Sequence, residues 1–236
     1  MFTPAPSHPN FQLRIFVMSN RKRFALLSIT FCLSLTWLTS TVVAAKRGVK
    51  PTKWRDLFEG KTLEGWEKTN YGGEGEVEVQ DGLLLLHFGY SMTGITYKRD
   101  DLPKTNYEIR ATVIKMNGND FFCGATFPVA DSFCSFIAGG WGGAVTGLSS
   151  IDGQDASENE TTGYQNFPEG KWYKVRIKVE PHLIQCWING KQVVYQNIQD
   201  RKITTRNEVN LNKPLGFATW ETKAGYKSIQ LSLIHI

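Results

Sequence analysis

Acidic residues gather between positions 152 and 160, and they are the side chains of this sequence best suited to catalysis. Asp152, Asp155, Glu158 and Glu160 follow one another in a polar, glycine-rich stretch. Cleavage of a glycosidic bond commonly uses two carboxyl groups, one that donates a proton and one that acts as nucleophile or base. We therefore predict these four as the candidate catalytic residues.

Two other interpretations of the same stretch stay open. A loop that offers several carboxylates, backbone carbonyls and the amide of Asn159 suits a hard cation such as calcium. The same acids also suit a solvated loop whose charges serve only solubility. Apart from the calcium alternative, we expect no metal and no required cofactor. The sequence has no Cys or His spacing typical of zinc, no Gly-x-Ser-x-Gly elbow, no P-loop and no dinucleotide fingerprint.

Three tryptophans and one arginine are candidate substrate-binding residues. The indoles of Trp141, Trp187 and Trp220 can present a flat apolar face to the C–H groups of a sugar. Trp187 lies between apolar neighbours in an alternating pattern, which predicts that it points away from the core. Arg110 alternates with apolar residues in the same way, and its guanidinium can clamp a carboxylate or a pair of hydroxyls. Packing of the indoles and simple solvation of the arginine are the competing interpretations.

Alternating polarity predicts strands as the elements that position these side chains. Apolar residues occupy every second position in 107–113 and 173–179, which indicates strands with one buried face. The pairs Asn189-Gly190 and Asp81-Gly82 are typical of tight hairpin turns. We find no convincing helical pattern, and we predict an antiparallel β-sandwich. The glycine-rich segments 139–143 and 149–163 interrupt this pattern and are predicted to be functional loops.

The first 45 residues have the order of a secretory signal. Three basic residues at 21–23 precede an apolar run at 24–38, and small residues at 43–45 predict cleavage after Ala45. The run is shorter than the about 20 residues that span a bilayer, so we expect no stable membrane span after cleavage. Met18 is an alternative start. We expect a secreted or periplasmic protein with an N-terminal extension and signal at 1–45, a short linker at 46–53 and one domain at 54–236.

The charge balance of the chain indicates whether nucleic acid is an expected partner. Four of the 27 basic residues precede residue 46, so 23 basic residues face 22 acidic ones in the rest of the chain. This balance leaves no excess of basic residues to bind a phosphate backbone, and we expect no nucleic-acid partner.

The three cysteines after the signal, Cys123, Cys134 and Cys186, permit one disulfide with one thiol left over. Three buried thiols are the alternative.

Five segments together resemble a known family. Its opening "LF-G-L-GW" motif, its "DG" turn, a central strand, its "NG" hairpin and its closing strand are similar to Trp54–Trp66, Val79–Leu84, Asn106–Arg110, Trp187–Gly190 and Tyr226–Leu231. The family is the domain of unknown function 1080, also labelled the 3-keto-disaccharide hydrolase domain. The resemblance covers residues 54–233. Two mid-chain motifs of the family are missing at 119–128 and 134–141, namely an arginine and a Glu-Gln pair, which indicates a divergent branch.

The resemblance implies a concanavalin A-like jelly-roll sandwich that bacteria secrete and that acts on carbohydrates. We expect a glycoside hydrolase for 3-keto-glycosides or related saccharides, with a saccharide bound in a groove on the concave sheet. A non-catalytic, lectin-like carbohydrate-binding module is the alternative. A structural protein that shares only the fold is a third class.

Overall fold

The computed structural model describes residues 53–234 of the chain. The predicted signal at 1–45 and the linker residues 46–52 lie outside the described residues. Within 53–234 there is no helix with the length and apolarity that a membrane span requires.

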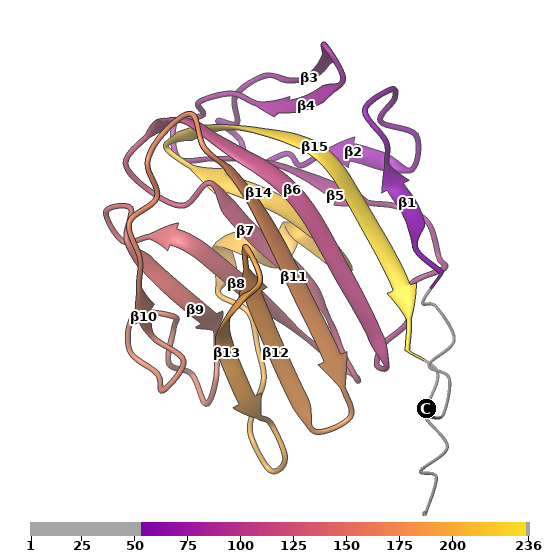
Figure 1. The fold of residues 1–236 in the computed structure, drawn as a ribbon, viewed down its shortest axis with the longest axis vertical. Helices are drawn as coiled ribbons and strands as arrows, with labels where there is room; N and C mark the ends of the chain where they lie inside the picture. Colours follow the sequence, from indigo (N-terminus) through magenta and orange to yellow (C-terminus); the bar gives the residue numbers. More distant parts are fainter. Residues whose placement is uncertain (1–52, 235–236) are drawn as a thin grey trace, which may run out of the picture. The chain divides into compact units, whose positions relative to one another are not determined.

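Strands form most of the described chain, together with one short 3₁₀ helix (Figure 1). Their bounds are β1 Arg55–Phe58, β2 Trp66–Lys68, β3 Val77–Gln80, β4 Leu83–Leu86, β5 Met92–Tyr97, β6 Tyr107–Gly118, β7 Cys123–Val129, β8 Ser132–Gly140, β9 Val145–Ser149, β10 Gly163–Tyr164, β11 Trp172–Glu180, β12 Leu183–Ile188, β13 Lys191–Asn197, η1 Asn207–Asn212, β14 Gly216–Trp220 and β15 Thr222–Leu233.

The strands pair into two antiparallel sheets that pack face to face. Sheet A has the order β13-β12-β11-β6-β15-β4-β3, and β1 pairs with the free part of β15. Sheet B has the order β10-β9-β8-β7-β14-β5-β2. In Figure 1, the long strands of sheet A lie in front of those of sheet B. The predicted jelly-roll sandwich is thus confirmed.

The alternating sequence pattern accounts for the core between the sheets. Along β6, Ile109 and Val113 are buried whereas Arg110 is exposed. In the neighbouring strand β11, Ile177 lies opposite Ile109, so the apolar residues of both strands share one face. Removing such side chains from water is the main force that holds the sheets together.

The two predicted hairpin turns are also present. Asn189 and Gly190 have φ angles of 50° and 83°, and they connect β12 to β13. Asp81 and Gly82 have φ angles of 51° and 78° between β3 and β4. Positive φ at both central residues is what a type I′ turn requires.

A second, smaller apolar cluster covers the outer face of sheet B. In β8, Phe136 points into the main core whereas Ile137 belongs to this second cluster. Phe121, Val145, Ala156 and Val209 also contribute. Loops and η1 therefore lie against a sheet face that would otherwise meet solvent, and they create the walls of a pocket there.

Two sequence predictions are resolved by the fold. The sequence shows no convincing helical pattern, and the one helical element of the described residues is η1, a short 3₁₀ element whose residues carry no amphipathic period long enough to detect. The cysteines Cys123, Cys134 and Cys186 are free and buried, so the disulfide alternative is wrong. Strands β7 and β8 are adjacent, but their register pairs Cys123 with Ala138 and Cys134 with Phe127.

Candidate functional site

A pocket of about 270 Å³ opens on the outer face of sheet B. Strands β5, β8, β9 and β14 form its floor, and the connections β6–β7 and β8–β9 together with η1 form its walls. Its lining residues are Met92, Asp120, Phe121, Ser135, Ile137, Trp141, Ser149, Arg206, Glu208, Val209 and Trp220. The pocket combines two predicted tryptophans with polar residues that the sequence analysis did not select.

Trp141 stands at the rim of the pocket in a strained turn. It has a φ angle of 48°, an unusual value for a bulky residue, and 41% of it is exposed. Gly142 and Gly143 continue the turn at φ angles of 83° and 99°. A Cβ at Gly143 would lie 3.0 Å from the carbonyl oxygen of Asn119, so this turn accepts no larger residue without a shift. The glycines thus hold an exposed indole over the pocket.

Asp120 is a carboxylate of fixed orientation in the pocket wall. Its Oδ1 accepts a hydrogen bond from the backbone N–H of Phe121 at 2.7 Å, and its Oδ2 accepts one from Gly142 at 3.1 Å. Its own backbone N–H donates to Oγ1 of Thr222 at 3.1 Å. These contacts tie the β6–β7 connection to the Trp141 turn, so the carboxylate and the indole are positioned together.

Arg206 contributes a cation to the lining of the pocket. Its Nη1 lies 2.5 Å from Oδ2 of Asp155, and its Nη2 lies 2.8 Å from Oε1 of Glu208. Its guanidinium carbon lies 5.9 Å from the ring centre of Trp141. The hydrogen bond to Glu208 raises the pKa of Arg206, and the same bond lowers the pKa of Glu208. Both groups are therefore charged at neutral pH.

Ser149 places an unpartnered hydroxyl at the pocket floor. The residue is 2% exposed, and its Oγ has no hydrogen-bond partner among the described residues. The neighbouring Ser135 hydroxyl is satisfied by Oγ1 of Thr126 at 2.8 Å. A buried hydroxyl without a partner is costly, so the Ser149 site favours a polar ligand group or a bound water.

A lysine lies behind the Trp141 turn. Lys115 is 5% exposed, and an ideal Cβ at Gly143 would be 3.5 Å from its Nζ. Burial lowers the pKa of Lys115, while the nearby carboxylates of Glu169 and Asp120 act in the opposite direction. Lys115 thus adds positive potential on the side of the pocket that carries Asp120.

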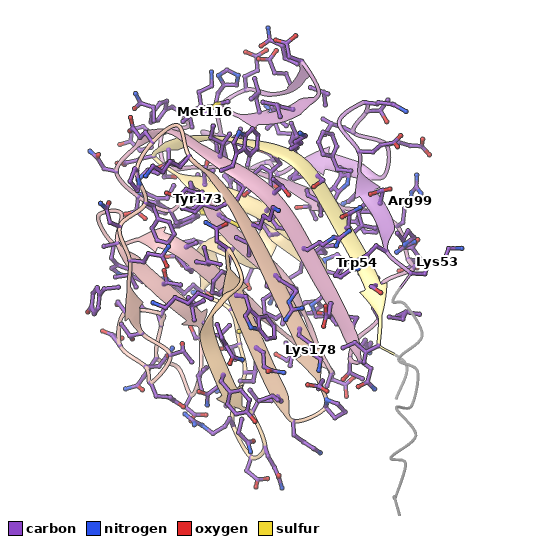
Figure 2. The ribbon with its side chains drawn as sticks, in the orientation of Figure 1. Lys53, Trp54, Arg99, Met116, Tyr173 and Lys178 are labelled. Atoms are coloured by element: carbon purple, nitrogen blue, oxygen red, sulfur yellow. The ribbon has the colours of Figure 1, made fainter. Side chains whose placement is uncertain are left out.

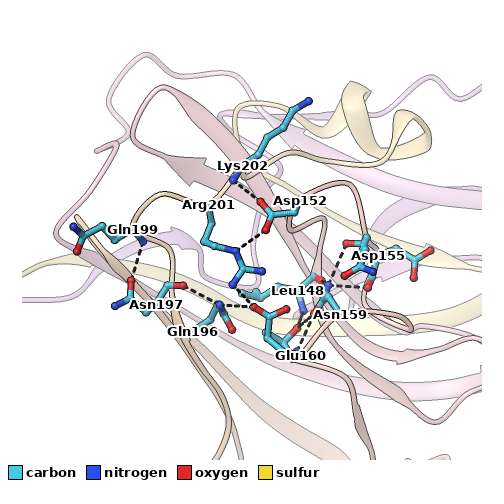
Figure 3. A network of polar contacts seen from close by, with 12 residues as sticks. Leu148, Asp152, Asp155, Asn159, Glu160, Gln196, Asn197, Gln199, Arg201 and Lys202 are labelled. Atoms are coloured by element: carbon cyan, nitrogen blue, oxygen red, sulfur yellow. Dashed lines mark hydrogen bonds and ion pairs between the residues drawn. The ribbon is translucent and has the colours of Figure 1, made fainter.

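The four predicted catalytic acids do not converge on one site. Figure 3 shows three of them, with Asp152 and Glu160 at Arg201 and Asp155 apart from that pair. Asp152 and Glu160 both pair with Arg201, at 2.6 Å and 2.5 Å. Backbone hydrogen bonding from Lys202 and the bond from Arg201 lower the pKa of Asp152, and Arg201 lowers the pKa of Glu160. These two acids hold the loop to the segment before η1, and neither lines the pocket.

The remaining two predicted acids differ in position. Asp155 is largely shielded and contacts the pocket indirectly, by holding Arg206. Glu158 is exposed and does not line the pocket. Residues 156–161 form turns and a bend, so Glu158 and Glu160 do not lie on one face of a strand.

The four predicted substrate-binding residues fall on opposite faces of the sandwich. Trp141 and Trp220 line the pocket on sheet B. Arg110 and Trp187 lie on the outer face of sheet A, where they line a second, open groove. The prediction that Trp187 points away from the core is confirmed. The arrangement excludes one site that contains all four residues, because the core lies between the two pairs.

Sequence reasoning missed the polar residues that complete the pocket. Asp120 and Phe121 lie where the period of two breaks between β6 and β7, and that break is a signal that can be read in the sequence. Ser149 ends a short strand, whereas Arg206 and Glu208 lie in a segment without any pattern. Only the tertiary structure brings these three to the pocket.

Among the described residues, one group of three side chains could hold a metal ion. Carboxylate oxygens of Glu76 and Glu78 and a ring nitrogen of His87 lie within 4.8 Å of one another on the hairpin of β3 and β4. His87 Nε2 already contacts Glu78 Oε1 at 2.9 Å. Calcium binding by the acids of the 152–160 loop stays a prediction; three of them are engaged by arginines instead.

Comparison with known proteins assigns the chain to a family. A family model described as the 3-keto-alpha-glucoside-1,2-lyase-like domain matches residues 53–232. This chain belongs to that family. The resemblance to the 3-keto-disaccharide hydrolase domain is therefore confirmed over nearly all the described residues. No curated protein matches the chain.

Solved structures share the fold of this 3-keto-alpha-glucoside-1,2-lyase-like domain at low sequence identity. An apo Crh5 transglycosylase is 13% identical, with 79% of this chain and 86% of that chain covered, at a TM-score of 0.54. A Bacillus subtilis protein of unknown function with a galectin-like fold is 9% identical, with 78% and 96% covered, at a TM-score of 0.54. A protein from work on endo-acting O-glycanases of the human gut microbiota is 9% identical, with 78% and 99% covered, at 0.53. These likenesses establish the sandwich fold.

Proposed function

We propose that the chain is a carbohydrate-active enzyme that cleaves glycosides carrying a ketone at C3 of the sugar, in the pocket on sheet B. The observation that carries this proposal is the convergence of the exposed indole of Trp141, the oriented carboxylate of Asp120, the cation of Arg206 and the unpartnered hydroxyl of Ser149 on one pocket. The family membership of residues 53–232 supports the choice of substrate class.

The ketone decides which reaction these groups can assist. A carbonyl at C3 makes the proton on C2 acidic, because the charge left by its removal spreads onto the carbonyl oxygen. Asp120 is proposed as the base that takes this proton. Arg206 is proposed to stabilise the negative oxygen. Glu208 is a weaker choice of base because it already pairs with Arg206 at 2.8 Å.

The electron pair then completes the cleavage. The electron pair of the enolate forms the C1=C2 double bond, and the C1–O bond to the leaving group breaks with its electrons on the leaving oxygen. The leaving oxygen takes up one proton from Asp120 or water, so the step balances as a 1,2-elimination. Addition of water across the new double bond gives the free keto sugar. Elimination followed by hydration thus equals the net hydrolysis that the sequence suggested.

The remaining groups in this proposal bind the sugar. Trp141 stacks against its C–H face, and Ser149 bonds one of its hydroxyls. Asp155 orients Arg206 without touching the substrate. We also propose that the enzyme acts outside the cytoplasm, on the basis of the signal-like order of residues 21–45.

A chromogenic substrate tests this proposal directly. We expect the purified protein to release p-nitrophenolate from p-nitrophenyl 3-keto-α-glucoside, and to leave the parent glucoside with its C3 hydroxyl intact. Deuterium at C2 should slow the release if proton removal limits the rate, whereas direct hydrolysis at C1 predicts no such primary effect. Asp120→Asn should lower kcat by about 10²–10⁴-fold, the usual contribution of a general base.

A matched variant and a binding measurement separate the alternatives. Lys202→Gln changes an exposed residue that does not line the pocket and should retain the wild-type rate. A folded protein that binds the keto sugar through Trp141 without any turnover would be a lectin-like module, and the enzyme proposal would then fall. One structural observation favours the lectin-like module. Glu208 and Asp155 are both already paired with Arg206, which makes them weaker choices as catalytic acid or base.

A further inference from the structure

A row of polar side chains crosses the outer face of sheet A, on the side of the sandwich away from the pocket. The strand registers place Trp187 of β12 beside Arg176 of β11, Arg176 beside Arg110 of β6, and Arg110 beside Gln230 of β15. All four line an open groove of about 540 Å³. In Figure 2 this face of sheet A is turned to the viewer.

The two arginines at the centre of this row repel each other. Arg110 and Arg176 are direct cross-strand neighbours, and like charges in this position are destabilising. Lys174, which also lines the groove, lies two residues from Arg176 on the same face of β11, about 7 Å away along the strand. Three cations therefore face one groove from adjacent rows of the sheet.

Each guanidinium is fixed in place by an indole. The Cζ of Arg176 lies 3.8 Å from the ring centre of Trp187, and that of Arg110 lies 4.1 Å from the ring centre of Trp54. Stacking of this kind holds the flat cation at low entropic cost and leaves its N–H edges free. Because arginines cover these indole faces, the same faces are not available as platforms for a neutral sugar.

The carboxylates around the groove neutralise its cations only in part. Glu108 forms an ion pair with Arg176 at 3.8 Å, beyond hydrogen-bond distance, and Lys178 pairs with Glu180 at 3.0 Å. Arg110 has no carboxylate within 4.0 Å among residues 53–234. Its Nε donates to Oε1 of Gln230 at 2.5 Å. The terminal nitrogens of Arg110 therefore remain available to an anion from outside.

We propose that this groove is a second binding site, specific for carboxylated polysaccharides such as polyuronates. A carboxylate between Arg110 and Arg176 relieves their repulsion and accepts paired hydrogen bonds from each planar fork. A polymer with a carboxylate on each sugar can also present a second carboxylate to Lys174. The site is independent of the catalytic proposal, since it lies on the other sheet and shares no residue with the pocket.

Binding to sodium polygalacturonate tests the proposal, with neutral dextran as the matched uncharged polymer. We expect the full chain to be retarded in gels that contain polygalacturonate and not in gels that contain dextran. The retardation should weaken as salt is raised, because partly exposed charges are screened. Each lost charge-assisted pair should weaken binding by about tenfold or more, so Arg110→Gln/Arg176→Gln should abolish retardation at the same polymer concentration.

Three further variants test whether binding depends on the position of the two arginines, on their planar guanidinium groups and on the pocket of sheet B. Lys61→Gln/Lys202→Gln removes the same charge from exposed positions outside the groove and should bind like the wild type. Arg110→Lys/Arg176→Lys keeps the charge without the planar forks and should bind at least several-fold more weakly than the wild type. It also keeps the proposal testable if the glutamine variant fails to fold. Trp141→Ala, in the pocket on sheet B, should retain polygalacturonate binding.

Several results would contradict the proposal of a carboxylate-binding site on sheet A. They are equal retardation by dextran, wild-type affinity in the folded glutamine variant or in the lysine variant, and tighter binding of duplex DNA than of polygalacturonate through the same two arginines. Loss of glycoside turnover in Asp120→Asn with intact polygalacturonate binding would leave this site in place, so failure of the two proposals can be told apart.

Discussion

Substitution of Asn159 tests how the loop beside the pocket is held. The side-chain amide of Asn159 donates to the carbonyl oxygens of Leu148 and Asp155, each at 2.7 Å, and to that of Gln154 at 3.1 Å. Its Oδ1 accepts from the backbone N–H of Thr161 at 2.9 Å and from the Thr161 hydroxyl at 2.6 Å. The residue is 6% exposed, so water cannot replace these bonds in the folded state.

The hydroxyl of Thr161 completes the arrangement by accepting from the backbone N–H of Leu148 at 2.8 Å. Asn159 and Thr161 together therefore satisfy both backbone groups of Leu148 on the open edge of β9. Figure 3 shows Asn159 beside Leu148. Asn159→Ala leaves several of these buried groups unpaired at about 1–3 kcal/mol each. Allowing for partial relaxation, we expect a loss of about 4 kcal/mol in the free energy of unfolding.

Urea denaturation followed by tryptophan fluorescence measures this loss. With a slope of about 2 kcal/mol per molar urea, the midpoint should fall by about 2 M. Asn159→Asp keeps the shape but turns a charge toward three carbonyls, so it should be at least as destabilising. Asn207→Ala, at an exposed position in η1, should stay within about 0.5 kcal/mol of the wild type. An Asn159→Ala midpoint within 0.5 M of the wild type would refute the reasoning.

Three further predictions concern pH, reactivity and packing. The hydrogen bond from its own backbone N–H, with those from Gly73 and Gly72, lowers the pKa of Glu74 to about 2 from its ordinary value near 4.5. Its stabilising effect is therefore complete above about pH 4.5 and is lost as the pH falls toward 2. Glu74→Gln should flatten the pH dependence of stability in that window, and an unchanged acid-denaturation profile would contradict this. Burial raises the pKa of Cys123 and of Cys134 to about 12, so a thiol reagent with peptide mapping should label neither in the native protein at pH 8 and both in 6 M guanidinium. Phe122→Ala removes a fully buried ring that packs 5.1 Å from both Phe167 and Tyr173, and calorimetry should show a loss of about 3–5 kcal/mol, against less than about 0.5 kcal/mol for the exposed Tyr195→Ala.

The buried position of Asn159 also indicates whether this residue can be glycosylated in the folded protein. Asn159-Glu160-Thr161 has the form of a glycosylation sequon. The side-chain nitrogen that would carry a glycan instead donates to three backbone carbonyls in a buried setting. In the folded protein this sequon is therefore structural, and its asparagine and threonine serve to hold a loop against β9.

Local patterns were sufficient to predict an antiparallel sandwich, whereas the jelly-roll form of that sandwich came from the resemblance to a family. The alternation in 107–113 and 173–179 decided which side chains face the core, because successive residues of a strand point to opposite faces. Two hairpin turns were predicted from Asn189-Gly190 and Asp81-Gly82, because few residues accept the positive φ angles that such turns require. The outward direction of Trp187 followed from the same alternation. These properties belong to a residue and its neighbours in the chain, so the sequence alone contains them.

The composition of the site was decided by tertiary structure. Alternation placed Arg110 and Trp187 on outer faces, but it could not tell the outer face of sheet A from that of sheet B, since every strand of a sandwich has one face toward the core and one away from it. Pairing of Asp152 and Glu160 with Arg201 depends on a segment 40 or more residues away in the chain. The approach of Asp120, Ser149 and Arg206 to one pocket depends on strand order and on η1. Sequence determined which residues are inside and outside, whereas only the packing of distant segments determined which outside residues meet.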